Sequence, residues 1–335
     1  MAVIQFKHGY NDIISLENLL EAWQEFLKGK RGRRDVQVFE RDLMKNIIEL
    51  HRDLTTKTYR HSAYHAFTIS DPKPRNIHKA TVRDRLLHHA LYRMLYPFFD
   101  RTFIADSYSC RFGGGAHKAI DRFRHYGRSI SRNHTQTAWV LKCDVKKFFA
   151  SIDQQILINI ACRYISDTDI ITLISEIVGS FHSTEKGKGL PLGNLTSQLL
   201  VNVYMNEFDQ FVKHKLNAKH YIRYADDFVI LHEDKDVLGE MLLKIQSFLK
   251  ERLKLSLHPN KVYIKTIASG VDFLGWVHFP HHRVLRTVTK RRMFRNIEAK
   301  QGNEGTVQSY LGLLKHGNGR KLRQRVKMTA NKGVS

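Results

Sequence analysis

The chain has few of the residues that build disulfide-bonded or cysteine-ligated domains. It contains three cysteines in 335 residues, at Cys110, Cys143 and Cys162, and no two of them are separated by two residues. A disulfide framework and a cysteine-rich zinc site are therefore not expected, and the reducing cytoplasm is the expected compartment. Proline is also scarce, at 6 residues, while 42% of residues are hydrophobic. This composition is typical of a globular chain with a sizeable core.

Long apolar runs and acidic residues are the other deficits. No run approaches the roughly 18 apolar residues that span a bilayer, and the N-terminus lacks a signal-peptide core, so no membrane partner is expected. Lysine and arginine number 55 against 32 aspartates and glutamates, a net charge of +23. Residues 281–335 hold 14 of the cations and two acids, which is 14 − 2 = +12, and residues 28–34 hold five more cations. This bias predicts a polyanionic partner, because clustered cations release counterions from phosphate backbones.

Hydrophobic spacing in the first hundred residues predicts helices around one extended pair. A helix is expected over 15–28, and a second, capped by Asp35, carries apolar residues every three or four positions to Leu50. Two extended segments, 63–70 and 75–80, flank a proline-containing turn. A further helix over 81–99 is expected to kink or end at Pro97.

The region 138–279 predicts an α+β sheet with helices on one face. Its order is strand, three helices, two strands, one helix and two strands. The expected strands are 138–143, 221–224, 228–231, 262–267 and 271–279, and the expected helices are 153–165, 167–178, a long helix from a glycine-rich loop (187–194) to about 215, and 237–253.

Three aspartates stand where these strands end. Asp144 follows an apolar strand, and Asp226 and Asp227 occupy the break between two strands. Paired acids in a turn are often plain turn formers. Three acids brought together would repel by roughly 4 kcal/mol per pair at about 4 Å and an effective dielectric of 20, so such a site normally holds a cation. Oxygen ligands select Mg²⁺ or Mn²⁺, and two such ions clamp the oxygens of an in-line phosphoryl transfer.

Five motifs in order resemble those of reverse transcriptases. The sequence Tyr-Ala-Asp-Asp at 224–227 resembles the YxDD box, and the strand that ends at Asp144 resembles the first catalytic motif. The loop 189–198 resembles the template and nucleotide loop, Lys261 falls at the lysine of a following motif, and residues 273–276 are similar to the primer-grip hairpin. The resemblance covers about 65–315. It implies a right-hand polymerase: an N-terminal helical segment (1–64), fingers (65–137), an antiparallel palm backed by helices (138–280, with part of the fingers inserted around 154–190) and a short, basic, helical thumb (281–335).

The resemblance also implies roles for single residues. Asp144 and Asp226 would bind two Mg²⁺ ions, with the Val145 carbonyl as a further ligand, and Asp227 would be a less direct acid. Lys261 would act as a general acid near the pyrophosphate, unless it is a surface lysine. The remaining residues would bind the nucleotide (Lys73, Arg75, Phe149, Leu192, Gly193, Gln198) or grip the primer (Phe273, Leu274, Gly275, Trp276). An aromatic side chain at Phe149 suits both a gate against the ribose 2′-OH and simple core packing.

The loop 189–198 indicates which type of reverse transcriptase the chain resembles. Leu192-Gly193 followed by Ser197-Gln198 resembles the reverse transcriptases of diversity-generating retroelements, within the group II intron-like lineage. That resemblance implies a structured template RNA, an RNA/cDNA duplex, dNTPs and a small basic accessory protein that forms a pentamer. Leucine at 192 cannot hydrogen-bond near the nascent base pair, so misincorporation at template adenine is expected. Two alternatives stay open: a group II-like or phage-defence reverse transcriptase with a non-coding RNA, and a catalytically silent RNA-binding protein.

Overall fold

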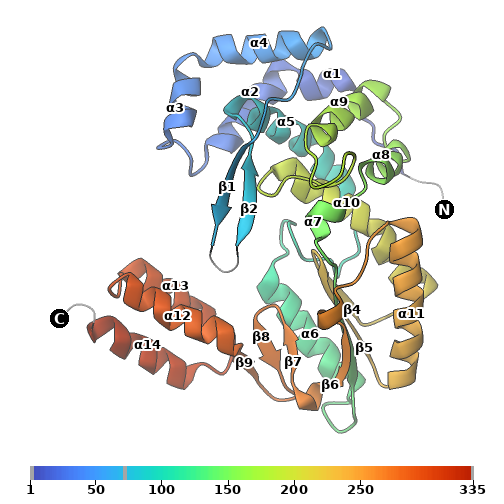
Figure 1. The fold of residues 1–335 in the computed structure, drawn as a ribbon, viewed down its shortest axis with the longest axis vertical. Helices are drawn as coiled ribbons and strands as arrows, with labels where there is room; N and C mark the ends of the chain where they lie inside the picture. Colours follow the sequence, from blue (N-terminus) through green and yellow to red (C-terminus); the bar gives the residue numbers. More distant parts are fainter. Residues whose placement is uncertain (1–3, 71–73, 333–335) are drawn as a thin grey trace. The chain divides into compact units, whose positions relative to one another are not determined.

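The computed structural model describes residues 4–70 and 74–332 (Figure 1). The chain divides into two compact units, which are described separately. Unit 1 consists of residues 1–105, 145–215 and 247–256, and unit 2 of residues 106–144, 216–246 and 257–335. The four predicted segments, from the N-terminal helices to the thumb, stay a prediction. None of the helices in the described ranges is long and apolar enough to cross a membrane.

Unit 1 is largely helical. Its helix α2 (Leu16–Leu27) packs against α5 (Val82–Asp100), and α5 also packs against α10 (Leu195–Gln210). The apolar side chains of Trp23 and Phe26 on α2 are therefore almost completely buried. The only strands assigned to its described residues form an antiparallel pair that opposes Ile69 and Arg75. The elements of unit 1 are α1 (Tyr10–Ile14), α2 (Leu16–Leu27), α3 (Arg34–Arg41), α4 (Leu43–Thr55), β1 (His65–Ile69), β2 (Arg75–Lys79), α5 (Val82–Asp100), α7 (Phe148–Ser151), α8 (Gln154–Cys162), α9 (Thr168–Gly179), α10 (Leu195–Gln210) and a π-helical turn, η1 (Phe211–Lys215).

Unit 2 contains a four-stranded antiparallel sheet in the order β4-β5-β3-β6 and a three-stranded sheet in the order β7-β8-β9. Helix α6 packs on β4 and β5. Its elements are α6 (Ala116–Ile130), β3 (Trp139–Asp144), β4 (Tyr221–Tyr224), β5 (Asp227–His232), η2 (Pro259–Lys261), β6 (Tyr263–Thr266), η3 (Ile267–Ser269), β7 (Val271–Phe273), β8 (Trp276–His278), β9 (Arg283–Leu285), α12 (Thr287–Ala299), α13 (Glu304–Leu314) and α14 (Arg320–Lys332), and α11 (Lys235–Arg252) begins in unit 2 and ends in unit 1.

The four-stranded sheet is buried on both faces. Phe228 and Val229 are successive residues of β5, so they point to opposite faces, and both are completely inaccessible to solvent. Both faces are therefore covered, beyond the single helical face that the element order predicted. The face that carries Val229 shares a hydrophobic core with α6 and with residues of α12, α13 and α14. One apolar cluster thus joins the sheet of unit 2 to its C-terminal helices.

Three predicted elements differ from the structure. The helix predicted from Asp35 is two helices, because the backbone at Asp42 leaves helical geometry (φ −112°, ψ 35°), and Asp35 lies in the first turn of α3, where its carboxylate pairs with Lys79 at 2.7 Å. Of the two outcomes expected at Pro97, a kink or an end, the end is wrong, because helix α5 continues to Asp100. The strand predicted over 271–279 is the hairpin β7–β8, since Gly275 (φ 85°) makes a turn inside it.

Candidate active site

The strand register of unit 2 brings the predicted acids to one end of its main sheet. Strands β3 and β5 are antiparallel, and Asp144 lies directly opposite Asp227. Strands β4 and β5 are also paired, with Tyr224 opposite Asp227, so Asp226 occupies the turn between them. The three carboxylates therefore belong to two neighbouring strand ends.

A buried arginine supports the turn that carries Asp226. Ala225 has a left-handed backbone (φ 54°), which costs free energy for a residue other than glycine. The Arg223 side chain is inaccessible to solvent; its Nη1 donates a hydrogen bond to the Ala225 carbonyl at 3.2 Å and its Nη2 donates to Ser107 Oγ at 3.0 Å. Arg223 is not among the residues predicted from the sequence, although a cation inside the apolar strand Tyr-Ile-Arg-Tyr is a signal that could have identified it.

Two lysines pair with the outer acids. Lys261 Nζ lies 2.7 Å from Asp144 Oδ1, and Lys142 Nζ lies 2.6 Å from Asp227 Oδ1. Lys142 is almost fully buried, and it was also missed by the sequence analysis. Its signal is its place in an otherwise apolar strand, two residues before Asp144.

Burial shapes the charge of these acids. Burial raises the pKa of Asp226, and repulsion from Asp144 raises it further. Burial raises the pKa of Asp227 to about 6, against the opposing attraction of Lys142. Both carboxyl groups are thus out of water, where the charged form is disfavoured. Of these influences, the repulsion between Asp144 and Asp226 is the one that a bound cation would relieve.

The donor set at this end of the sheet suits a hard divalent ion. Asp144 and Asp226 supply carboxylate oxygens, which Mg²⁺ and Mn²⁺ prefer, and the repulsion between them is what such an ion would relieve. Within residues 4–70 and 74–332, no group of three or more histidine, cysteine or acidic side chains converges on one point as a metal site. Two carboxylates, rather than a closed cage, are thus what the chain offers. Val145, whose carbonyl is the third predicted ligand, follows Asp144 directly and is buried.

The predicted nucleotide-binding residues of unit 1 gather around β2. Arg75 is exposed at the start of this strand, whereas Lys73 lies outside the described residues. The Leu192 carbonyl accepts a hydrogen bond from the His78 backbone N–H at 3.1 Å, which ties the loop 189–194 to the strand. Gly193 (φ 107°) approaches so closely that a Cβ atom would lie 2.9 Å from Ile77 Cγ2.

Other predicted residues lie on the helices that follow. Gln198 is half-buried in the first turn of α10, where its backbone N–H donates to the Asn194 carbonyl at 3.3 Å. Phe149 is half-buried in α7, with its ring centroid 5.5 Å from that of Phe148. Both the gate and the packing interpretations of Phe149 remain compatible with this placement. Asn194 joins the loop to β2 through a hydrogen bond from its Nδ2 to the His78 carbonyl at 3.1 Å, and it was missed because its partner is 116 residues away.

The primer-grip residues form the tip of the hairpin β7–β8. Phe273 and Trp276 are opposite each other and almost fully buried, and they belong to the core shared with α12, α13 and α14. Leu274 (φ 49°) and Gly275 (φ 85°) form the turn between them. Two of the four residues are thus core residues, and two form the turn.

Comparison with protein families identifies this arrangement. The family described as reverse transcriptase (RNA-dependent DNA polymerase) matches residues 70–278, more than half of the chain. The chain belongs to this family. The matched range includes all three acids at the strand ends, the loop 189–198 and the hairpin turn at 274–275.

Several curated proteins are similar to the chain at low identity. Protein YkfC of Escherichia coli (strain K12) is 26% identical over 254 residues, which cover 65% of each chain. The group II intron-encoded protein LtrA of Lactococcus lactis is 23% identical over 68% of this chain and 38% of its own length. The retron Ec83 reverse transcriptase of Escherichia coli is 30% identical over 37% of this chain and 42% of its own length. The chain spans less than two thirds of the length of the curated relatives that it matches.

A solved structure shows the fold. Apo telomerase from Candida tropicalis, truncated from its C-terminal domain, superposes with a TM-score of 0.50 over 72% of this chain and 60% of its own, at 11% identity. The predicted α+β fold of a right-hand polymerase, with an antiparallel sheet and helices, is confirmed.

Proposed function

We propose that the chain is an RNA-directed DNA polymerase that copies a structured RNA into cDNA. The observation that supports this proposal is that Asp144, Asp226 and Asp227 lie at neighbouring strand ends, at one end of the sheet of a reverse transcriptase domain. Intact acids at these positions argue against a silent RNA-binding protein, since buried carboxylates that repel one another are costly without a cation to bind. Its substrates would be dNTPs and a template RNA, and its product an RNA/cDNA duplex.

Two of the acids would bind metal ions, and the third would support the site. Asp144 and Asp226, with the Val145 carbonyl, would hold two Mg²⁺ ions, for which Mn²⁺ is an alternative. These ions supply Lewis-acid stabilisation of the attacking and leaving oxygens in phosphoryl transfer. Asp227 supports the site through its ion pair with Lys142. Lys261, now paired with Asp144, is the proposed donor of a proton to the leaving pyrophosphate.

Residues of unit 1 would bind the incoming nucleotide. Arg75, with Lys73, offers cations to the triphosphate, for which guanidinium geometry is suited. The loop that carries Leu192 and Gly193 is held on β2 by one backbone hydrogen bond from His78 and by the Asn194 side chain, so its shape is set before the nucleotide arrives. Gln198 and Phe149 complete the proposed pocket, and the hairpin 273–276 is the proposed primer grip.

Primer extension with Asp226→Asn tests the proposed reaction. The amide keeps the size of the side chain but removes a charge that would bind metal, so we expect extension on RNA with Mg²⁺ to fall on the order of a thousandfold, the equivalent of several kcal/mol of lost transition-state stabilisation. Glu233→Gln is the matched control, because Glu233 is exposed beyond the far end of β5 and loses the same charge. Equal activity of wild type and Asp226→Asn would contradict the proposal.

The finer proposal is a diversity-generating retroelement enzyme that is error-prone at template adenine. This proposal rests on Leu192 and on Ser197-Gln198. It implies a small basic accessory protein as a partner, which is a pentamer in the family that the chain resembles. We expect Leu192→Gln to lower the error frequency at template adenine several-fold, because a glutamine would restore a polar contact near the base pair. Sequencing of cDNA measures this, with Leu192→Met as the apolar control. An unchanged adenine error frequency would exclude Leu192 as the cause.

The relatives favour a second candidate. LtrA is a group II intron-encoded protein and Ec83 a retron reverse transcriptase, so a group II-like or phage-defence enzyme with a non-coding RNA partner is the alternative. Sequencing the RNA that co-purifies with the chain separates the two. A template repeat with a variable homologous copy nearby supports the retroelement, and an intron or a compact non-coding RNA supports the alternative.

A further inference from the structure

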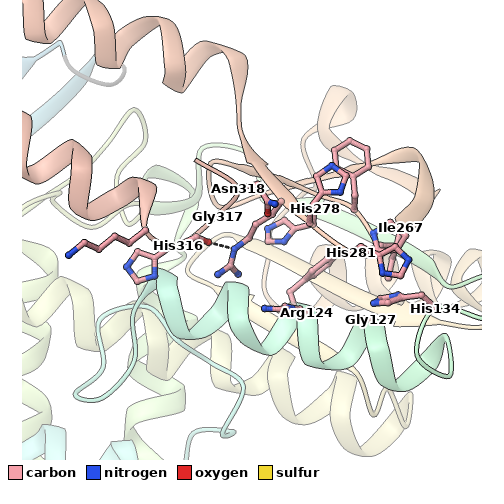
Figure 2. Close-up of a pocket in the computed structure, with 15 residues that line it drawn as sticks. Arg124, Gly127, His134, Ile267, His278, His281, His316, Gly317 and Asn318 are labelled. Carbon is pink, nitrogen blue, oxygen red and sulfur yellow. Dashed lines mark hydrogen bonds between the residues drawn. The ribbon is translucent and has the colours of Figure 1, made fainter. Parts of the chain in front are cut away.

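Unit 2 contains a cavity of about 240 Å³ that runs along α6 (Figure 2). Fifteen residues line it, from α6 and the loop after it, from η3, from β8, β9 and their connection, and from the segment that joins α13 to α14. Five of them are histidines, three are arginines or lysines, and none is acidic. Figure 2 shows His316 at one end of α6, Arg124 midway along the helix, and His134 with His281 near its other end. The cavity is therefore a cationic groove without an acid in its described lining.

One of the arginines that line this groove has a buried donor without an acceptor. Arg283 is held by a hydrogen bond from its Nη2 to Asp121 Oδ1 at 2.9 Å and by one from its Nε to the His316 carbonyl. Its Nη1 is buried and makes no hydrogen bond within the described part of the chain. A buried donor of this kind is costly unless a ligand supplies an acceptor, and an anionic ligand supplies the strongest one.

The imidazoles crowd against one another and against cations. The rings of His134 and His281 lie 4.9 Å apart in an edge-to-face pair, and those of His117 and His316 are stacked at 3.5 Å. Burial lowers the pKa of His134, and His281 and nearby arginines lower it further. Each of these groups would gain from a negative charge placed between them, because an anion lowers the mutual repulsion.

We propose that this groove binds a backbone phosphate of a nucleic acid strand. Arginine and imidazole N–H groups from separate chain segments can donate to the two non-bridging oxygens of one backbone phosphate, each of which accepts more than one hydrogen bond. The choice of a nucleic acid rests on the proposed function and on the +12 charge of residues 281–335, which supply several of the fifteen lining residues. The groove uses none of the proposed catalytic acids, so it is a second, separate phosphate site.

Binding of a fluorescent single-stranded RNA to the full chain, measured by anisotropy at several salt concentrations, tests this inference. Arg124→Gln is the test variant, because Arg124 is an exposed residue of α6 and its loss leaves the core intact. We expect a three- to tenfold weaker affinity and a salt slope smaller by about 0.7, the value of one phosphate contact on a single strand. Arg41→Gln is the control, because Arg41 is an exposed arginine of α3 in unit 1 and lies outside the lining, so this variant should stay within twofold of wild type.

Inorganic phosphate distinguishes the source of the ligand. In NMR spectra of protein with isotope-labelled histidines, inorganic phosphate should shift the imidazole resonances of His134 and His281 in wild type. The shifts should be smaller in Arg124→Gln. Such shifts together with unchanged RNA affinity in Arg124→Gln would show a free-phosphate site and overturn the proposed strand contact. No shift and no affinity change would overturn the site altogether. Wild-type RNA binding without primer extension would contradict the proposed function and leave this test intact.

Discussion

The pKa values of individual residues in this chain depend on burial more than on a nearby charge. Asp227 has a pKa of about 6 although Lys142 lies 2.6 Å away, because burial is the larger influence. His278 follows the same rule in the opposite direction: it is almost fully buried against Phe123, and burial lowers its pKa to about 4. A charge must leave water to occupy either position, so the neutral form is favoured.

His278 therefore predicts a loss of stability in acid. A histidine whose folded pKa is depressed stabilises the fold fully above its unfolded pKa of about 6.5, and this contribution is lost as the pH falls towards 4. Between pH 7 and pH 5 the loss from this one group is roughly 1 to 2 kcal/mol in the free energy of unfolding. Urea denaturation at the two pH values measures it.

The variant His278→Phe provides the comparison. Phenylalanine is of similar size and cannot be protonated, so the difference between pH 7 and pH 5 should shrink by that amount. His281→Phe is the control, because His281 is exposed. An equal pH dependence in wild type and His278→Phe would show that His278 does not resist protonation.

At the scale of elements, the hairpin β7–β8 packs against the C-terminal helices where the backbone of Gly317 lies close to the indole ring of Trp276. Gly317 lies between α13 and α14, and a Cβ atom there would stand 2.1 Å from Trp276 Cζ3. The indole is buried in the shared core and cannot move aside without disturbing it. Glycine is thus required by packing and not by a left-handed backbone.

Gly317→Ala should therefore destabilise unit 2 by about 1 to 3 kcal/mol, the usual cost of overpacking. Gly312→Ala is the matched control: Gly312 lies inside α13, and nothing lies within 4 Å of an added Cβ. It should stabilise by roughly 0.5 to 1 kcal/mol through helix propensity. Chemical denaturation of both variants measures the difference, and two substitutions of equal effect would contradict this account of Trp276.

At the scale of the whole molecule, the positive charge is concentrated in the C-terminal part of the chain. Residues 281–335 carry +12 of the total +23, and their described part forms β9, α12, α13 and α14. Arg291 and Arg295 are exposed and four residues apart, so they share one face of α12. Such a face suits a phosphate backbone, which is contacted without reading the base sequence.

We expect the double variant Arg291→Gln/Arg295→Gln to weaken binding of an RNA–DNA duplex and to reduce its salt slope by up to about 1.8, or about 0.9 for each phosphate that the variant no longer neutralises. The charge-matched control is Arg31→Gln/Arg34→Gln, in the basic cluster of residues 28–34, where both side chains are exposed. Anisotropy titrations between low and moderate salt measure both. A larger effect in the control would place the duplex contact in the N-terminal cluster instead.

The order of elements and the position of the acids could be read from the sequence, because both are local. The apolar run before Asp144 predicts a strand, and the break at 225–227 predicts the strand turn that the structure contains. The split at Asp42 could not be read, since the helical spacing of apolar residues continues across it. The sequence left both a kink and an end open at Pro97, since proline removes a helical hydrogen bond, and the structure shows that α5 continues past it.

The sequence by itself determined the family resemblance, the charge and the residues that would perform the chemistry. Only the tertiary structure showed what supports them: Arg223 under the turn at Ala225, Lys142 beside Asp227, and His78 against the loop of Leu192. The groove along α6 is likewise invisible in the sequence, because its histidines and arginines come from segments more than a hundred residues apart. Spacing along a chain reports local geometry, whereas burial and charge compensation depend on which distant segments come into contact.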